Sequence, residues 1–208
     1  MSISECHGLL ADVVFVAQRP ITEENEIILL DFIGKMIDRF NLGDNKTHIG
    51  FVEYGDAAQS RFNLNRYFTP TEIKSALNMD GNVGLYTTGG IMEMHDKQFT
   101  AANGDRPGIP NIAILITDRQ SVDQRQQANA IEAAESAQQA GIKMFTIALN
   151  IIDHDAFFHN NPSFFDAMSS SPHRQGLNYW IVDSYDKLEN IALITDTIAA
   201  AICREKGI

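Results

Sequence analysis

The sequence predicts an α/β fold, a doubly wound, mostly parallel six-stranded sheet with one antiparallel edge strand and helices on both faces. Short apolar runs alternate with amphipathic helical stretches along the chain. Runs such as Asn111–Thr117 are almost wholly apolar, as expected for strands buried on both faces of a parallel sheet. The Gly55-Asp56 pair joins two strand-like runs and indicates a hairpin, which supplies the antiparallel edge.

The first half of the chain is predicted to form a strand, a helix, the hairpin and a short helix. The expected ranges are Ala11–Ala17, Glu23–Phe40, Thr47–Tyr54, Gln59–Leu64 and a helix that begins after Thr69. In the first helix, Ile27, Leu30, Ile33, Ile37 and Phe40 recur at the helical spacing that predicts one buried face. Thr69 and Glu72 have the spacing of a capping box.

The second half continues the alternation. The expected elements are helix Gly89–Ala101, strand Asn111–Thr117, helix Asp123–Ala140, strands Ile142–Leu149 and Asn178–Val182, and helix Ser184–Arg204. Four glycines between Gly81 and Gly90 are interpreted as a flexible turn before a helix. Two phenylalanine pairs, at 157–158 and 164–165, belong either to the core or to an exposed contact surface. Neither a linker nor an internal repeat is evident, so residues 1–208 are predicted to be one domain.

Composition excludes several functions. The 208 residues carry a net charge of −11, which argues against binding to nucleic acid or to an anionic membrane surface. No apolar run approaches 18 residues, so membrane insertion is not expected, and the first residues lack the pattern of a signal peptide. An acidic surface suits a soluble module, a cation-rich setting or a basic partner. The sequence has no dinucleotide-binding glycine motif after the first strand and no Gly-x-Ser-x-Gly elbow.

Two cysteines, Cys6 and Cys203, bracket the predicted fold. Because the termini of a domain often lie close together, we expect them to form a disulfide, the alternative being two separate buried thiols. A disulfide implies an oxidising, extracytoplasmic location. Asn45 begins an Asn-Lys-Thr glycosylation sequon, which agrees with that location.

The ends of two predicted strands are chemically mismatched. Strand Asn111–Thr117 runs into Asp118, in an acidic, hydroxyl-rich loop of the kind that holds a divalent cation. Strand Ala11–Ala17 runs into residues 18–22 (Gln-Arg-Pro-Ile-Thr), which contain no carboxylate. One half of a metal site is therefore present. The loop that would complete it carries the positively charged side chain of Arg19 and no carboxylate.

Several segments resemble, in order, a von Willebrand factor A domain, which has a Rossmann-like fold. They are ADVVFVA, ITEEN, THIGFVEYGD, the Thr-Thr-Gly-Gly sequence, RPGIPNIAILITDRQSVD, GIKMFTIAL and NYWIVDSYDKLENI. The likeness covers about Asp12 to Cys203 and is similar to A domains of matrilins, non-fibrillar collagens and mussel byssal matrix proteins. It implies a secreted, non-enzymatic adhesion module of the extracellular matrix. Its implied partners are collagen or another matrix protein, and neighbouring A domains.

The resemblance also implies a metal-ion-dependent adhesion site, but this sequence departs from its pattern. The family uses Asp-x-Ser-x-Ser after the first strand, a Thr before the third helix and an Asp after the fourth strand. Gln18 takes the place of the first Asp, and an alternative alignment leaves that loop two residues short. The Thr position falls on Tyr86 or on Thr87. Asp118 matches the last Asp, but Arg119 replaces the glycine that follows it.

We therefore expect a top edge without a cofactor, in which Arg19 or Arg119 pairs with Asp118 in place of the ion. The candidate binding residues at this edge are Gln18, Arg19, Thr22, Tyr86, Thr87, Asp118 and Arg119. The alternative is a Mg²⁺-dependent module that uses Asp118 and Thr87, with Thr22 and water. A third hypothesis, an enzyme, requires a deep polar pocket at the strand ends, and the sequence offers no catalytic set to line it.

Overall fold

A computed structural model describes residues 10–119, 121, 123–149, 162–189 and 200. These residues form a sheet in the strand order β3-β2-β1-β4-β5-β6. The strands are β1 (Asp12–Gln18), β2 (His48–Tyr54), β3 (Ala58–Phe62), β4 (Asn111–Thr117), β5 (Lys143–Leu149) and β6 (Tyr179–Val182). Only the β2–β3 pair is antiparallel within this sheet, so the predicted fold class is confirmed.

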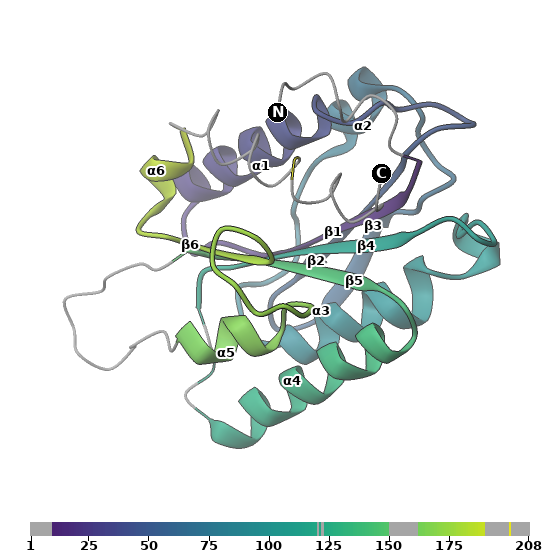
Figure 1. The fold of residues 1–208 in the computed structure, drawn as a ribbon. Coiled ribbons are helices and arrows are strands. Elements are labelled where there is room, and N and C mark those ends of the chain that lie inside the picture. The colour runs from purple at the N-terminus through teal and green to yellow at the C-terminus, as the bar shows by residue number, and fades with distance from the viewer. Residues whose placement is uncertain (1–9, 120, 122, 150–161, 190–199, 201–208) are drawn as a thin grey trace.

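Helices cover both faces of the sheet (Figure 1). One face carries α1 (Glu23–Ile37), α2 (Pro70–Ala76) and α6 (Tyr185–Glu189), and the other carries α3 (Thr87–Glu93), α4 (Gln124–Gln139) and α5 (Pro162–Ala167). Since successive side chains of a strand point to opposite faces, β1 serves two cores. Val13 and Phe15 pack in the core under α1, and Val14 and Val16 pack in the core under α3 and α4.

The helix predicted over residues 23–40 is shorter than expected, and one of its assigned core residues is wrong. Ile27 is 62% exposed, because the buried stripe of α1 runs along a neighbouring line of the helix. That stripe consists of Leu29, Phe32, Ile33, Met36 and Ile37. Thr22 is the N-cap of α1, and its hydroxyl accepts a hydrogen bond from the Asn25 backbone N–H at 3.2 Å.

The helix predicted at Gly89–Ala101 begins two residues earlier and changes its geometry. α3 ends at Glu93, a π-helical turn, η2, spans Met94–Gln98, and a 3-10 turn, η3, spans Ala101–Asn103. The π turn directs the Gln98 side chain against β2, where Gly50 leaves room for it. There its amide nitrogen donates to the Phe62 carbonyl at 3.2 Å.

Of the two phenylalanine pairs, the second lies in the core. Phe164 and Phe165 are 4% and 1% exposed and pack under α4. The alternative of a contact surface is therefore wrong for this pair, and residues 157–158 lie outside the described residues. None of the helices in the described ranges is long and apolar enough to cross a membrane.

The amino-terminal edge of the sheet is closed by an ion pair. The buried Asp12 carboxylate accepts hydrogen bonds from Arg106, through Nε at 2.9 Å and Nη2 at 2.6 Å. Asn45 is exposed in the turn before β2, at this same edge. Any glycan on Asn45 would therefore lie at the opposite edge of the sheet from the site described next.

Candidate functional site

The candidate site lies where β1 and β4 end, at the carboxyl-terminal edge of the sheet. Gln18 is the last residue of β1, and its side chain joins three segments. Its amide oxygen accepts from the Thr117 hydroxyl at 2.7 Å and from the Asp118 and Arg119 backbone N–H groups at 3.2 Å each. Its amide nitrogen donates to the Gly84 carbonyl at 2.8 Å. A carboxylate cannot make that last bond, so the uncharged amide suits this position.

The Asp118 carboxylate is 1% exposed and is held by protein groups on both oxygens. Oδ1 accepts from Arg119 Nε at 2.8 Å, and Oδ2 accepts from the Tyr185 hydroxyl at 2.8 Å. Arg119 also donates from Nη2 to the Arg19 carbonyl at 2.9 Å. The guanidinium, 17% exposed, therefore lies across the top of the carboxylate and joins the β1 and β4 loops.

Arg19 does not pair with Asp118. Its guanidinium contacts Glu26 at 3.0 Å and the buried Glu53 at 3.3 Å. Glu53 also accepts from the backbone N–H groups of Asp80 and Gly81, at 3.1 and 2.9 Å. This carboxylate fastens the loop before α3 to the sheet. Of the two arginines expected near Asp118, only Arg119 contacts it.

Two buried tyrosines lie beneath the site. Burial raises the pKa of Tyr185 far above its ordinary value, and the negative charge of Asp118 raises it further. Burial also raises the pKa of Tyr54, against the effect of the Thr117 and Thr87 hydroxyls beside it. Both phenols therefore stay protonated at neutral pH, and Tyr185 can act only as a donor to the carboxylate.

Residues 81–90 form a turn and the start of α3, as predicted, and close backbone contacts hold this segment against the sheet. Gly55 and Gly84 allow two backbones to touch where any Cβ would clash, and the Tyr86 N–H donates to the Gly55 carbonyl at 2.8 Å. At Gly89 a Cβ would collide with the Tyr86 ring, and at Gly90 with the Tyr54 ring. The two adjacent glycines thus accommodate one aromatic ring at the surface and one in the core.

The predicted candidate residues separate into two groups. Gln18, Thr87 and Asp118 are buried and hold the edge together. Thr22 and Tyr86 are exposed, and Arg19 and Arg119 are partly exposed. Tyr185 and Glu53 were missed by the sequence analysis. The signal for Tyr185 was its place just after a strand end, and for Glu53 a charge within an apolar strand.

These residues do not fit Mg²⁺. A hard cation needs negative oxygens in an open octahedral shell, whereas both Asp118 oxygens already accept hydrogen bonds and one of the donors is a cation. Gln18 contributes no charge, and Thr22 caps α1. Within the residues that the structure describes, no three His, Cys, Asp or Glu side chains are grouped to hold a metal ion.

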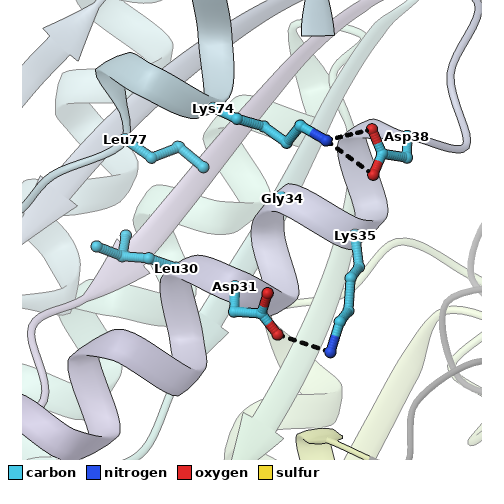
Figure 2. Close-up of a pocket in the computed structure, with 7 residues that line it drawn as sticks. All are labelled: Leu30, Asp31, Gly34, Lys35, Asp38, Lys74 and Leu77. Atoms are coloured by element: carbon cyan, nitrogen blue, oxygen red, sulfur yellow. Dashed lines mark hydrogen bonds and ion pairs between the residues drawn. The ribbon is translucent and has the colours of Figure 1, made fainter. Parts of the chain in front are cut away.

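Three of the hollows on the described surface are lined at least in part by helices. One, of about 280 Å³, lies between α1 and α2, and its charges are paired within it: Lys35 with Asp31 at 2.6 Å and Lys74 with Asp38 at 2.7 Å (Figure 2). The other two, of about 510 and 360 Å³, lie along α3 and α4, the larger beside Tyr86 and the smaller beside Met92. The residues that line these hollows in the described chain do not form a nucleophile–base pair at the strand ends.

Comparison with known proteins gives consistent matches. The model of the von Willebrand factor type A domain matches residues 12–193. Matrilin-1 of Mus musculus is 30% identical over 146 residues, which are 68% of this chain and 28% of that protein. The collagen alpha-6(VI) chain of Homo sapiens is 24% identical over 201 residues, which are 95% of this chain and 8% of that protein.

Among solved structures, proximal thread matrix protein 1 of the mussel byssus aligns with a TM-score of 0.75 and 20% identity, over 93% of this chain and 47% of that chain. The same protein with a zinc-occupied MIDAS motif aligns with a TM-score of 0.74 and 18% identity, over 94% of this chain and 49% of that chain. At these identities the likeness shows the fold alone. The chain spans less than a third of the curated relatives named above.

The relatives confirm the resemblance to A domains of matrix proteins and, with it, the predicted extracellular location. The predicted Cys6–Cys203 disulfide lies outside the described residues.

Proposed function

Because the chain belongs to the von Willebrand factor type A domain family, we propose that it is a non-enzymatic adhesion or scaffolding module. It binds collagen or another matrix protein without a bound metal ion. Residues 1–208 act as one domain, closed by the Cys6–Cys203 disulfide, with neighbouring A domains as further partners. Nucleic acid and membrane insertion play no part.

The observation that carries the proposal is the occupation of Asp118. In the metal-dependent mode, an ion on this carboxylate keeps one coordination position open for an oxygen of the partner. Here the guanidinium of Arg119 donates to one carboxylate oxygen of Asp118, the side from which a metal ion would bind. The Tyr185 hydroxyl donates to the other oxygen. The top edge is thereby stabilised without an ion, and its partner contacts come from Tyr86, Arg19, Arg119 and Thr22.

The decisive experiment measures binding of the full chain to immobilised collagen with Mg²⁺ and again with EDTA. We expect equal binding in both. A Tyr86→Ala variant should bind more weakly, because it removes a half-exposed aromatic side chain from the contact surface. Ile27→Ala, which truncates an even more exposed apolar residue on α1, is the control and should bind as the wild type does.

A second candidate is the Mg²⁺-dependent module, which is favoured by the zinc-occupied MIDAS motif of a similar structure. It requires Arg119 to leave Asp118. Collapse of collagen binding in EDTA, with recovery on adding Mg²⁺, would establish it and refute the ion-free proposal. If no collagen binds under either condition, collagen is not the partner.

A further inference from the structure

The two hollows along α3 and α4 form one groove. They share Thr88 and Asn129 in their linings, so the two hollows lie side by side from the top edge down along the two helices. We call it the α3–α4 groove. Its upper end lies beside Tyr86 and its lower end beside Met92. Two adjoining open hollows along a pair of helices suit a chain segment better than a compact small molecule.

The groove exposes apolar side chains at both ends. Tyr86 and Met92 are 49% and 46% exposed, and they are two of only five large hydrophobic residues that are exposed in the described part of the chain. Both lie in the lining of this groove. Tyr86 is also fixed in place, since its ring rests on Gly89 and its backbone N–H is bonded to the Gly55 carbonyl. A fixed aromatic ring contributes contact area at little cost in conformational entropy.

The charge of the groove is of one sign. Among the described residues, its lining contains Asp56, Asp96 and Glu132 and no lysine or arginine. The hollow between α1 and α2 is different, because its acidic side chains are already paired with lysines (Figure 2). The nearest partner of Asp96 is His95, at 3.1 Å, which is charged only when protonated. An unbalanced negative potential in a concave surface attracts a positively charged partner.

We propose that the α3–α4 groove binds an extended, positively charged segment of a protein partner. Lysine or arginine side chains of the segment contact Asp56, Asp96 and Glu132, and apolar side chains lie against Tyr86 and Met92. The inference rests on the proposed function only in taking the partner to be a matrix protein. It adds the chemistry of the segment and the surface that receives it.

The test uses the full chain and two fluorescently labelled peptides. Both have the same length and the same leucines, and one carries lysines where the other carries glutamates. We expect the lysine peptide to bind saturably and more weakly at high salt, with chemical-shift changes on α3 and α4, and the glutamate peptide not to bind. Shift changes centred on α1 or α2, or equal binding of both peptides, would overturn the proposal, as would absence of saturable binding by the lysine peptide.

Variants identify the groove as the source of binding. The double variant Asp96→Asn/Glu132→Gln should weaken binding of the lysine peptide about tenfold, since two exposed ion pairs are lost. Met92→Ser should weaken it through the apolar contact. The matched control is Asp31→Asn/Asp186→Asn, which makes the same change in net charge on the α1–α6 face and should have no effect. An equal loss in this control would show that only net charge matters and would overturn the proposal.

Collagen binding by the same variants separates the two proposals. If the lysine peptide binds in the groove and no collagen binds, the groove inference stands and the collagen proposal fails. If collagen binds equally to the wild type and to the groove variants while the lysine peptide does not bind, the groove inference fails and the collagen proposal stands.

Discussion

Replacing Arg119 with methionine tests whether its guanidinium stabilises the top edge in place of an ion. The methionine keeps most of the apolar stem and removes the charge and both hydrogen bonds, to Asp118 and to the Arg19 carbonyl. Asp118 retains the Tyr185 hydrogen bond, but its charge remains buried without the cation on Oδ1.

The geometry sets the size of the effect. At 2.8 Å, two unit charges attract by roughly 6 kcal/mol at an effective dielectric constant of about 20. Removing one partner of a buried pair costs about 3 to 5 kcal/mol, because the other charge stays desolvated. Since the Arg119 side chain is 17% exposed, we expect the lower end, about 3 kcal/mol. For a chain of this length, that lowers Tm by roughly 6 to 12 °C.

The assay is urea unfolding of the wild type, Arg119→Met, Asp118→Asn and the double variant. If the charges act as a pair, the sum of the stability losses of the two single variants should exceed the loss of the double variant. The difference, which is the coupling energy, should be at least about 1.5 kcal/mol. A coupling energy below about 0.5 kcal/mol would refute the reasoning, because the two charges would then act independently.

Three further predictions concern the surrounding structure. Burial raises the pKa of Tyr185 above its ordinary value of 10.0, so the folded protein holds the phenol proton more tightly than the unfolded chain does. The stability that this proton contributes is complete below about pH 10, and above that pH it declines by about 1.4 kcal/mol per pH unit. Tyr185→Phe should remove that part of the slope in urea unfolding between about pH 9.5 and 11.5; an unchanged slope would contradict the burial argument. Glu53→Gln should cost about 2 to 3 kcal/mol and speed proteolysis at residues 77–86, because the Gly81 N–H and its neighbours lose a charged acceptor; unchanged cleavage would count against this role. Gly34→Ala should stabilise α1 by about 0.5 to 1 kcal/mol in urea unfolding, because the new Cβ meets only the flexible Lys74 side chain, at 3.4 Å (Figure 2); a loss of stability would show that Lys74 cannot yield.

The strands were predictable because their signal is local. Residues 111–117 are apolar in every position but the first and last, and the structure places β4 over the same range. Helix boundaries were less predictable, since an apolar residue such as Ile27 fits a helical period without facing the core. The buried stripe of α1 is set by the sheet beneath it, which the local pattern does not contain.

At the site, the absence of a carboxylate at Gln18 was visible in the sequence, but the bonds that replace it were not. Which arginine contacts Asp118 depends on loop geometry, because Glu26 and Glu53 draw Arg19 away. The Tyr185 contact joins residues 67 positions apart, and only the fold brings them together.

The strand order has a mechanical consequence. β1 lies between two parallel neighbours and is paired at seven positions with β2 and at six with β4. A tensile load along β1 would have to shear both ladders together. The edge strands β3 and β6 are each paired with a single neighbour, at four positions. Under tension the sheet should therefore yield first at an edge strand, while β1 stays paired.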